Sequence, residues 1–287
     1  MMKRFMCGAL AAAVAFSALA VAPSADAAKA PKAKYTFNMN KKSKKVVAVA
    51  RKKDTANYTT SNTETGTLPE AKNAKKVKLK YVKGKHGKAL YLDRTSSYGA
   101  ELKGVKLGSK SWTVSFWVKS ANKVSDFMAI FFTGNNIVNP KKTKWLSITA
   151  ASWLDGGNCP VVWSHNAANG QFPWYAYQDE EGTWVGDVAV KPNKWVHITV
   201  VVDTKDTCEY GTAGEEGYVK SYHAWTYVNG KLYGNGTVAK GTMSNSNKFF
   251  LGINAWDTPF KGYFDDVKLF NKALTAKQVK ALYKSVK

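Results

Sequence analysis

The segment SWTVSFWVKS, residues Ser111–Ser120, decides the fold class of this chain. Apolar residues occupy every second position along it, namely Trp112, Val114, Phe116 and Val118. Successive side chains of an extended strand point to opposite faces, so this spacing places the whole set on one face. The segment is therefore predicted to be a β-strand with one face in a core.

The same period of two recurs elsewhere. In Lys76–Val82 three apolar residues alternate with lysines, which puts part of the lysine excess on the wet side of a sheet. Val196–Val202 repeats the pattern, and Tyr35–Asn38 has the composition of a short first strand. Asn229-Gly230 fits the two left-handed positions of a type I′ hairpin turn. Short strands separated by turns favour a β-sandwich or jelly roll.

One helix is predicted near the end of the sequence. Thr275 and Gln278 have the spacing of a capping box, and Val279 and Leu282 follow at helical spacing. An amphipathic helix must bury its apolar side, so we expect it to pack on the sandwich.

Several motifs resemble those of the concanavalin A-like, laminin-G-like jelly rolls of secreted bacterial proteins. They are GKHGKALYLDRTSSYGAEL (84–102), SWTVSFWVKS (111–120), KPNKWVHITVVVD (191–203), TYVNGKLYG (226–234) and FFLGINAWDTPFKGYFDDVKLFNKALTAKQVKALY (249–283). The resemblance spans residues 35–283, with 123–191 unmatched. It implies an all-β, two-sheet antiparallel β-sandwich with a short C-terminal helix, a single domain over 35–287, and a curved sheet that often faces a ligand.

The N-terminal residues have the layout of a secretory signal peptide. Lys3 and Arg4 precede an apolar run, and Ala25-Asp26-Ala27 is a typical cleavage site. We predict a signal peptide over 1–27, a basic flexible lead-in over 28–34, and a secreted or cell-surface bacterial protein. The apolar run is too short to span a membrane comfortably, and no second one follows.

The formal net charge is +23, carried by 43 Lys and Arg against 20 Asp and Glu. Such a field attracts anionic partners, for example an acidic polysaccharide or an anionic cell-wall polymer. The alternative is that the lysines only form a solvated surface that keeps the protein soluble. Nucleic acid is not expected as a partner, because no recognition motif is present. We expect a monomer.

An exported protein allows Cys159 and Cys208 to form a disulfide. The alternative is that both remain buried thiols. The family resemblance also implies a structural calcium ion between the first and last strands, with Asn38 and Asp265 in the positions of its ligands. Asn38 replaces the acid more usual there, which lowers the charge of the site and its expected affinity.

Binding of a sugar requires flat apolar rings for pyranose faces and short polar side chains for hydroxyl groups. The region unmatched by the resemblance and the loop before the last strand are rich in both. The predicted ligand-binding residues are Trp153, Asp155, Trp163, His165, Trp174, Tyr175, Tyr177, Trp184, Asn254, Trp256 and Asp257. About half of such rings are expected to be buried in the core. Trp112 and Trp195 open regular strands and are predicted to be core residues.

The sequence does not favour an enzyme. Glucanases of this fold carry a Glu-x-Asp-x-Glu run on one strand, which this chain lacks. Asp265 and Asp266 are adjacent, so a regular strand would direct them to opposite faces. The four histidines have no metal-ligand spacing. We therefore predict non-catalytic carbohydrate binding by an aromatic-lined face. The alternative is an adhesion or scaffolding protein that binds an anionic wall polymer or a protein through its basic surface.

Overall fold

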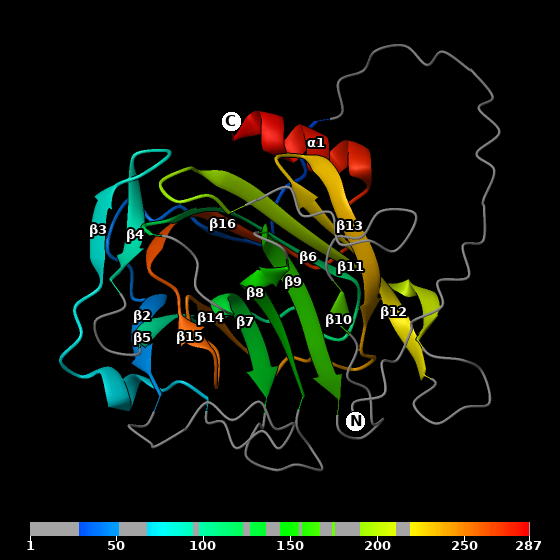
Figure 1. Ribbon diagram of the computed structural model, residues 1–287, viewed down its shortest axis with the longest axis horizontal. Coiled ribbons are helices and arrows are strands. Elements are labelled where there is room, and N and C mark those ends of the chain that lie inside the picture. The colour runs from blue at the N-terminus through cyan, green and yellow to red at the C-terminus, as the bar shows by residue number, and fades with distance from the viewer. Residues whose placement is uncertain are drawn as a thin grey trace.

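The computed structural model describes residues 29–51, 68–93, 98–122, 127–135, 144–154, 157–166, 174–175, 190–210 and 219–286. For 151–154, 157–159, 174–175, 208, 210 and 219–220 only the backbone is described. Within these ranges two sheets pack face to face (Figure 1), which confirms the predicted β-sandwich. Within each sheet, all pairs of neighbouring strands are antiparallel except one, the parallel pair of β15 with β7.

The first sheet has the strand order β13-β12-β11-β6-β16-β4-β3, and β1 pairs with β16. Its strands are β1 (Tyr35–Phe37), β3 (Lys80–Lys83), β4 (Lys88–Leu92), β6 (Trp112–Ser120), β11 (Val196–Tyr210), β12 (Val219–Val228), β13 (Lys231–Val238) and β16 (Gly262–Phe270).

The second sheet has the order β10-β9-β8-β7-β14-β5-β2, and β15 pairs with β7. Its strands are β2 (Val46–Ala50), β5 (Tyr98–Leu102), β7 (Met128–Asn135), β8 (Lys144–Leu154), β9 (Gly157–Asn166), β10 (Trp174–Tyr175), β14 (Lys248–Leu251) and β15 (Thr258–Pro259). A short 3₁₀ helix, η1 (Ala71–Ala74), follows β2.

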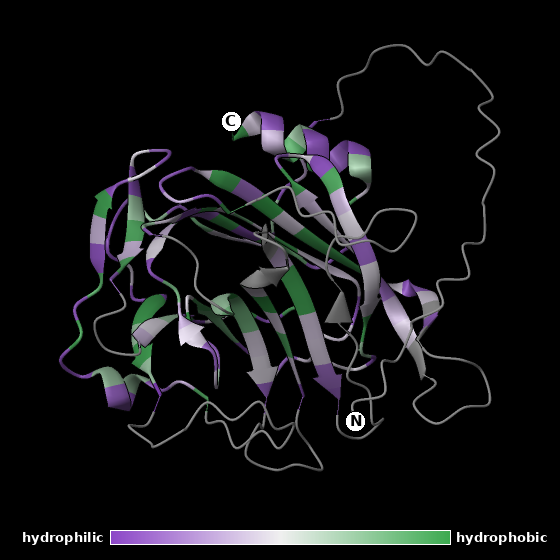
Figure 2. Ribbon diagram, in the orientation of Figure 1, coloured by the Kyte–Doolittle hydropathy of each residue, from purple (hydrophilic) through white to green (hydrophobic). Residues whose placement is uncertain are grey.

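The main core lies between the sheets and is made by alternate residues of each strand (Figure 2). Phe116 of β6 and Ile198 of β11 face Phe131 of β7, and all three are fully buried. The phenyl rings of Phe116 and Phe131 stack with centroids 6.2 Å apart. The apolar positions of Ser111–Ser120 therefore face the core as their spacing predicts.

The Asn229-Gly230 hairpin turn is confirmed between β12 and β13. Asn229 has φ 50° and Gly230 has φ 75°, the left-handed pair of a type I′ turn. A side chain at Gly230 would also meet Tyr283, because an added Cβ would lie 2.9 Å from the Cβ of Tyr283. The turn thus also forms a seat for the C-terminal helix.

The predicted helix is α1 (Ala276–Ser285), and its capping box is formed. The Thr275 hydroxyl accepts the Gln278 N–H, and the Gln278 side chain accepts the Thr275 N–H. The helix buries Val279 and Leu282 against the outer face of the first sheet.

Strand β3 is shorter than predicted. The alternation in Lys76–Val82 suggested a strand from Lys76, whereas the ladder begins at Lys80. Val77 and Leu79 still pack against the core, while the intervening lysines are exposed. The alternation of polar and apolar residues therefore predicted correctly which side chains are buried. It did not predict that 75–79 forms no hydrogen-bonded ladder with a neighbouring strand.

The expectation that Asp265 and Asp266 point to opposite faces is wrong. A bulge interrupts the β16 ladder after Asp265, and Asp266 adopts φ 44°. As a result both carboxylates turn toward His86. Asp265 Oδ2 accepts the His86 backbone N–H at 2.9 Å, and Asp266 Oδ2 lies 2.8 Å from His86 Nδ1.

The predicted signal peptide lies outside the described residues, and so do 52–67 of the loop that precedes η1. In the part of the chain that is described, no helix has the length and apolar character needed to cross a membrane.

Candidate functional site

The outer face of the second sheet carries a row of cross-strand neighbours. Phe132 of β7 lies opposite Ser147 of β8, and Ser147 lies opposite Trp163 of β9. Directly opposed residues point to the same side of a sheet. Phe132 and Ser147 are fully buried, whereas Trp163 is partly exposed. The Trp163 indole N–H donates to the Thr149 hydroxyl at 3.2 Å, which fixes the ring over the strand.

A second pair, Trp145 and His165, lies next to this row. The Trp145 side chain is 1% exposed, and its ring is edge-on to the His165 imidazole with centroids 6.0 Å apart. Burial lowers the pKa of His165 below its usual value of 6.5. The imidazole is therefore neutral at pH 7 and can both donate and accept a hydrogen bond.

The loop between β14 and β15 covers this face. Ile253 lies over Gly99 of β5, where an added Cβ would come within 2.4 Å of the isoleucine side chain. The ring of Trp256 packs edge-on against those of Trp145 and Phe132, with ring centroids 4.6 Å and 5.7 Å apart. The indole of Trp256 stays partly exposed. The loop thus buries the inner rings and leaves Trp163 and Trp256 accessible.

Asn254 is the polar centre of the loop and is fully buried. Its Oδ1 accepts the backbone N–H groups of Trp256 (3.1 Å) and Asp257 (2.7 Å). Its Nδ2 donates to Ser147 Oγ at 3.2 Å and to Asp257 Oδ2 at 2.6 Å. One amide thereby fixes the loop conformation and ties it to β8.

Asp257 is held in a partly desolvated position beside Asn254. Burial raises its pKa from 3.8 to about 6, against the opposing effects of the Asn254 hydrogen bond and the charge of Arg51. The carboxyl group therefore changes its protonation state just below neutral pH. It can accept a hydrogen bond from a hydroxyl group when ionised and donate one when protonated.

Five of the predicted ligand-binding residues come together on this face: Trp163, His165, Asn254, Trp256 and Asp257. The backbone of Trp174 and Tyr175 forms β10, where Trp174 pairs with Trp163 and Tyr175 with Val162. The backbone of Trp153 lies in β8. The remaining three, Asp155, Tyr177 and Trp184, lie outside the described residues, as do the side chains of Trp153, Trp174 and Tyr175.

Three further residues of this face, Trp145, Ser147 and Thr149, were not among the predicted ligand-binding residues. They occupy every second position of β8 on its outer face, and Leu146, Ile148 and Ala150 between them face the core. The same period of two that identified β6 was the available signal. Of the two tryptophans predicted to be core, Trp112 is buried, whereas Trp195 is partly exposed.

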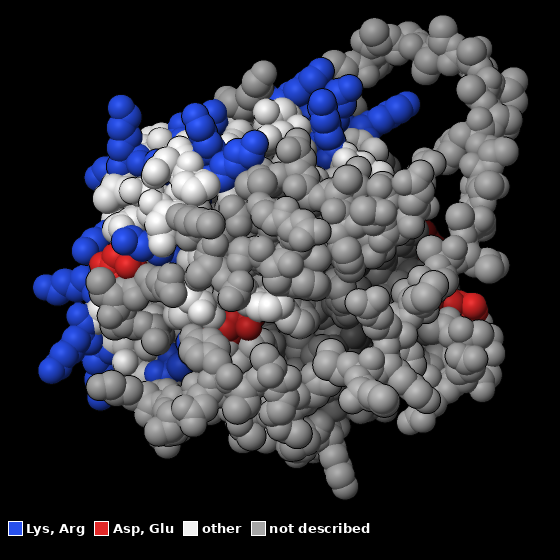
Figure 3. Space-filling view, in the orientation of Figure 1, with Lys and Arg blue, Asp and Glu red and all other residues white. Residues whose placement is uncertain are grey.

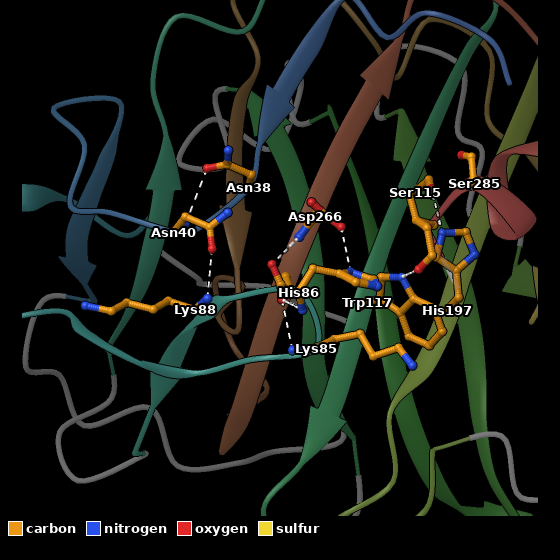
Figure 4. A network of polar contacts seen from close by, with 12 residues as sticks. Asn38, Asn40, Lys85, His86, Lys88, Ser115, Trp117, His197, Asp266 and Ser285 are labelled. Carbon is orange, nitrogen blue, oxygen red and sulfur yellow. Dashed lines mark hydrogen bonds and ion pairs between the residues drawn. The ribbon is translucent and has the colours of Figure 1, made fainter.

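The donors around Asp265 do not fit a calcium ion. Asp265 Oδ2 accepts the N–H groups of Lys85 (3.0 Å) and His86 (2.9 Å), and Oδ1 accepts that of Asp266 (2.8 Å). Figure 4 shows Asn38 directed at the backbone of Asn40. Calcium requires six to eight oxygen ligands. Within the described ranges no three His, Cys, Asp or Glu residues are grouped to hold a metal. Calcium binding stays a prediction that these contacts do not favour.

The predicted disulfide is not tested, because the side chains of Cys159 and Cys208 lie outside the described atoms. Their backbones belong to different sheets, Cys159 to β9 and Cys208 to β11.

Comparison with known proteins identifies the family. The profile described as the concanavalin A-like lectin/glucanases superfamily, Laminin_G_3, matches residues 94–280. The chain therefore belongs to this superfamily. No curated protein sequence is similar enough to this chain to count as a match.

Several solved structures are similar to this chain. One is domain 4 of AbnA, a GH43 extracellular arabinanase from Geobacillus stearothermophilus, in complex with arabinotriose, with 26% identity, a TM-score of 0.51, and 72% of this chain and 82% of that chain covered. Another is the binding domain of Paraclostridial Mosquitocidal Protein 1, with 16% identity and a TM-score of 0.49 over 72% of this chain and 45% of that one. A third is the binding domain of botulinum neurotoxin DC in complex with SialylT, with 17% identity and a TM-score of 0.48 over 73% and 45%.

Proposed function

We propose that this chain binds a carbohydrate on the outer face of the second sheet, between Trp163 and Trp256. The observation that carries the proposal is the arrangement of these two partly exposed indoles beside the partly exposed carboxyl group of Asp257, which the buried Asn254 holds in place. Indole faces suit the C–H surfaces of sugar rings, and the partly exposed side chains of Asp257 and His165 suit hydroxyls.

The comparison with the arabinanase domain supports this proposal. That domain is in complex with arabinotriose, and it is 26% identical to this chain. A shared fold does not fix a ligand, so the sugar must be identified by experiment. Short arabinose oligomers are the first ligands to test.

We also propose that binding occurs without catalysis and outside the cell. The sequence lacks the paired carboxylates of the glucanases of this fold, and it begins with a signal-peptide pattern. Detection of the protein in the culture medium or at the cell surface tests export. Incubation with arabinan followed by analysis of released sugars tests catalysis.

Calorimetric titration with linear arabinan and arabinotriose tests the site. Trp163→Ala and Trp256→Ala should each weaken binding by about tenfold or more, because each removes a stacking surface. Trp225→Ala is the matched control, since this partly exposed ring lies on β12 of the first sheet, outside the proposed site. Unchanged affinity in both Trp163→Ala and Trp256→Ala would place any sugar site elsewhere.

A further inference from the structure

The outer face of the first sheet carries a row in which lysines flank aromatic residues. Lys80 of β3 lies opposite Tyr91 of β4, Tyr91 opposite Tyr263 of β16, and Tyr263 opposite Lys119 of β6. Trp195, just before β11, continues the row beyond Lys119. We call these five residues the lysine–aromatic row. Neighbouring strands are about 4.8 Å apart, so the row extends for roughly 19 Å.

The members of the row contact one another and remain accessible. The rings of Tyr91 and Tyr263 have centroids 4.7 Å apart, and those of Tyr263 and Trp195 are 6.1 Å apart. Lys119 Nζ lies 4.1 Å from the Tyr263 centroid and 5.2 Å from that of Trp195. All three rings are partly exposed. A contiguous group of exposed rings is unusual on a soluble surface and indicates binding more often than a single exposed residue does.

A lysine-lined cleft adjoins one end of the row. Its volume is about 630 Å³. Lys72, Lys75, Lys76, Lys78 and Lys80 line it, together with Asn73, Val77, Asp93 and Tyr98. Lys80 belongs to both the cleft and the row, so the two surfaces are continuous. Figure 3 shows Lys and Arg side chains projecting along this edge of the molecule, where β3 and β4 lie.

The positive charge of the cleft is only partly neutralised. Lys72 pairs with Glu70 at 2.7 Å, and Lys80 pairs with Asp93 at 3.1 Å. Lys75, Lys76 and Lys78 form no ion pair with a described carboxylate. Among the described residues, every cation that lines the cleft is a lysine. An ammonium group acts as a point charge, whereas an arginine fork binds one carboxylate in a fixed geometry. Such a surface therefore suits charges that repeat along a chain.

From this combination we infer that the lysine–aromatic row and the cleft bind a uronate-bearing polysaccharide. The rings of Tyr91, Tyr263 and Trp195 provide the stacking surface for the sugar faces. Lys119 and the cleft lysines attract the carboxylates. This site lies on the opposite sheet from the proposed arabinose site and does not depend on it.

Polygalacturonate is the probe, and its highly methyl-esterified form is the matched ligand control, because esterification removes the charge and keeps the backbone. We expect the esterified polymer to bind at least tenfold more weakly. The triple variant Lys75→Gln, Lys76→Gln, Lys78→Gln should bind polygalacturonate more weakly and with a smaller dependence on NaCl concentration. The triple variant Lys277→Gln, Lys280→Gln, Lys284→Gln removes the same charge from exposed positions of α1 and should bind like the wild type.

The aromatic part of the site has its own test. Tyr91→Ala should weaken binding of polygalacturonate by about tenfold, and Tyr91→Phe should restore it, because Phe keeps the ring. Circular dichroism and urea denaturation check that each variant folds. Trp195→Ala, which lies outside the strand ladders, replaces Tyr91→Ala if that variant does not fold, and it should also weaken binding.

Three results would overturn the inference: no binding of polygalacturonate, equal weakening by the two triple lysine variants, or unchanged binding after loss of an aromatic ring. The second result would mean that binding depends only on the overall positive charge of the protein. The third would mean that the lysines bind the polymer without help from the aromatic rings. Trp163→Ala and Trp256→Ala should bind polygalacturonate normally, so failure of the arabinose site and failure of this site are distinguished.

Discussion

The two outer faces of the sandwich are covered in different ways. On the first sheet, α1 packs over β6 and β11, and beneath it the Trp117 side chain is 3% exposed. The Trp117 indole N–H donates to the Val286 carbonyl at 2.9 Å, and its ring lies 5.2 Å from that of His197. On the second sheet, the 252–257 loop packs over β7 and β8 and leaves Trp163 and Trp256 partly exposed.

The difference shows that the element packed on the outer face of a sheet determines whether the aromatic rings of that face are accessible to a ligand. A helix presents a continuous apolar side and removes the rings below it from water. The loop uses one buried amide, Asn254, to hold its shape, and its own indole remains at the surface. Around Tyr91 of β4 and Tyr263 of β16, which neither the helix nor the loop covers, lysines flank the rings.

Removal of a buried ring under the loop is the strongest test of this comparison. Trp145→Ala should lower the free energy of unfolding by about 3–5 kcal/mol, because it leaves a cavity beneath Trp256. Urea denaturation measures the change. Trp163→Ala, at a partly exposed position on the same face, should cost clearly less. Equal losses would mean that the loop buries both rings alike.

The seat of the helix gives the next effect. Gly230→Ala should lower the free energy of unfolding by about 1–3 kcal/mol, because the position has φ 75° and the new Cβ would meet Tyr283. Gly104→Ala is the matched control, since Gly104 has φ 77° and open space at the Cβ position. The difference between the two variants measures the contact with α1. If they lose the same stability, the helix does not depend on this seat.

The helix cap gives a smaller effect. Thr275→Ala should cost about 1 kcal/mol in thermal or urea denaturation, because the Gln278 N–H loses its acceptor. Thr275→Ser keeps the hydroxyl and should retain most of the stability. A loss in Thr275→Ser as large as in Thr275→Ala would show that packing, not capping, matters at this residue.

The pH dependence of stability tests how strongly the loop on the second sheet buries Asp257. The pKa of Asp257 is raised from 3.8 to about 6, so the folded protein binds its proton more tightly than the unfolded chain. Between about pH 4 and pH 6, this group therefore makes the free energy of unfolding fall as the pH rises. Asp257→Asn should make the fall shallower in urea titrations across this range. An unchanged slope would show that Asp257 is well solvated.

The sequence predicted the architecture because its information is local. The period of two in β6 and β11, the Asn229-Gly230 turn and the Thr275 capping box each act within a few residues, and the structure confirms all four. Short-range signals of this kind depend on backbone geometry that neighbouring residues determine.

The site was predicted only in part, because it depends on strand register. Trp163, His165, Asn254, Trp256 and Asp257 were predicted, and the structure brings them together. Trp145 was not predicted to be in the site, although the sequence shows its alternation with the core residues of β8. The lysine–aromatic row could not be predicted, since it requires knowing that β3, β4, β16 and β6 are neighbours in that register.

The bulge in β16 also determines which residues of the last strand are buried. Three residue steps on β16, from Asp265 to Lys268, match two on β6. Before the bulge the even-numbered Phe264 faces the core, and after it the odd-numbered Val267 and Leu269 do. The extra residue thus reverses the parity of the strand. A deletion of one residue at this point would therefore restore a regular strand and keep Val267 and Leu269 facing the core, whereas a deletion of two would turn both outward.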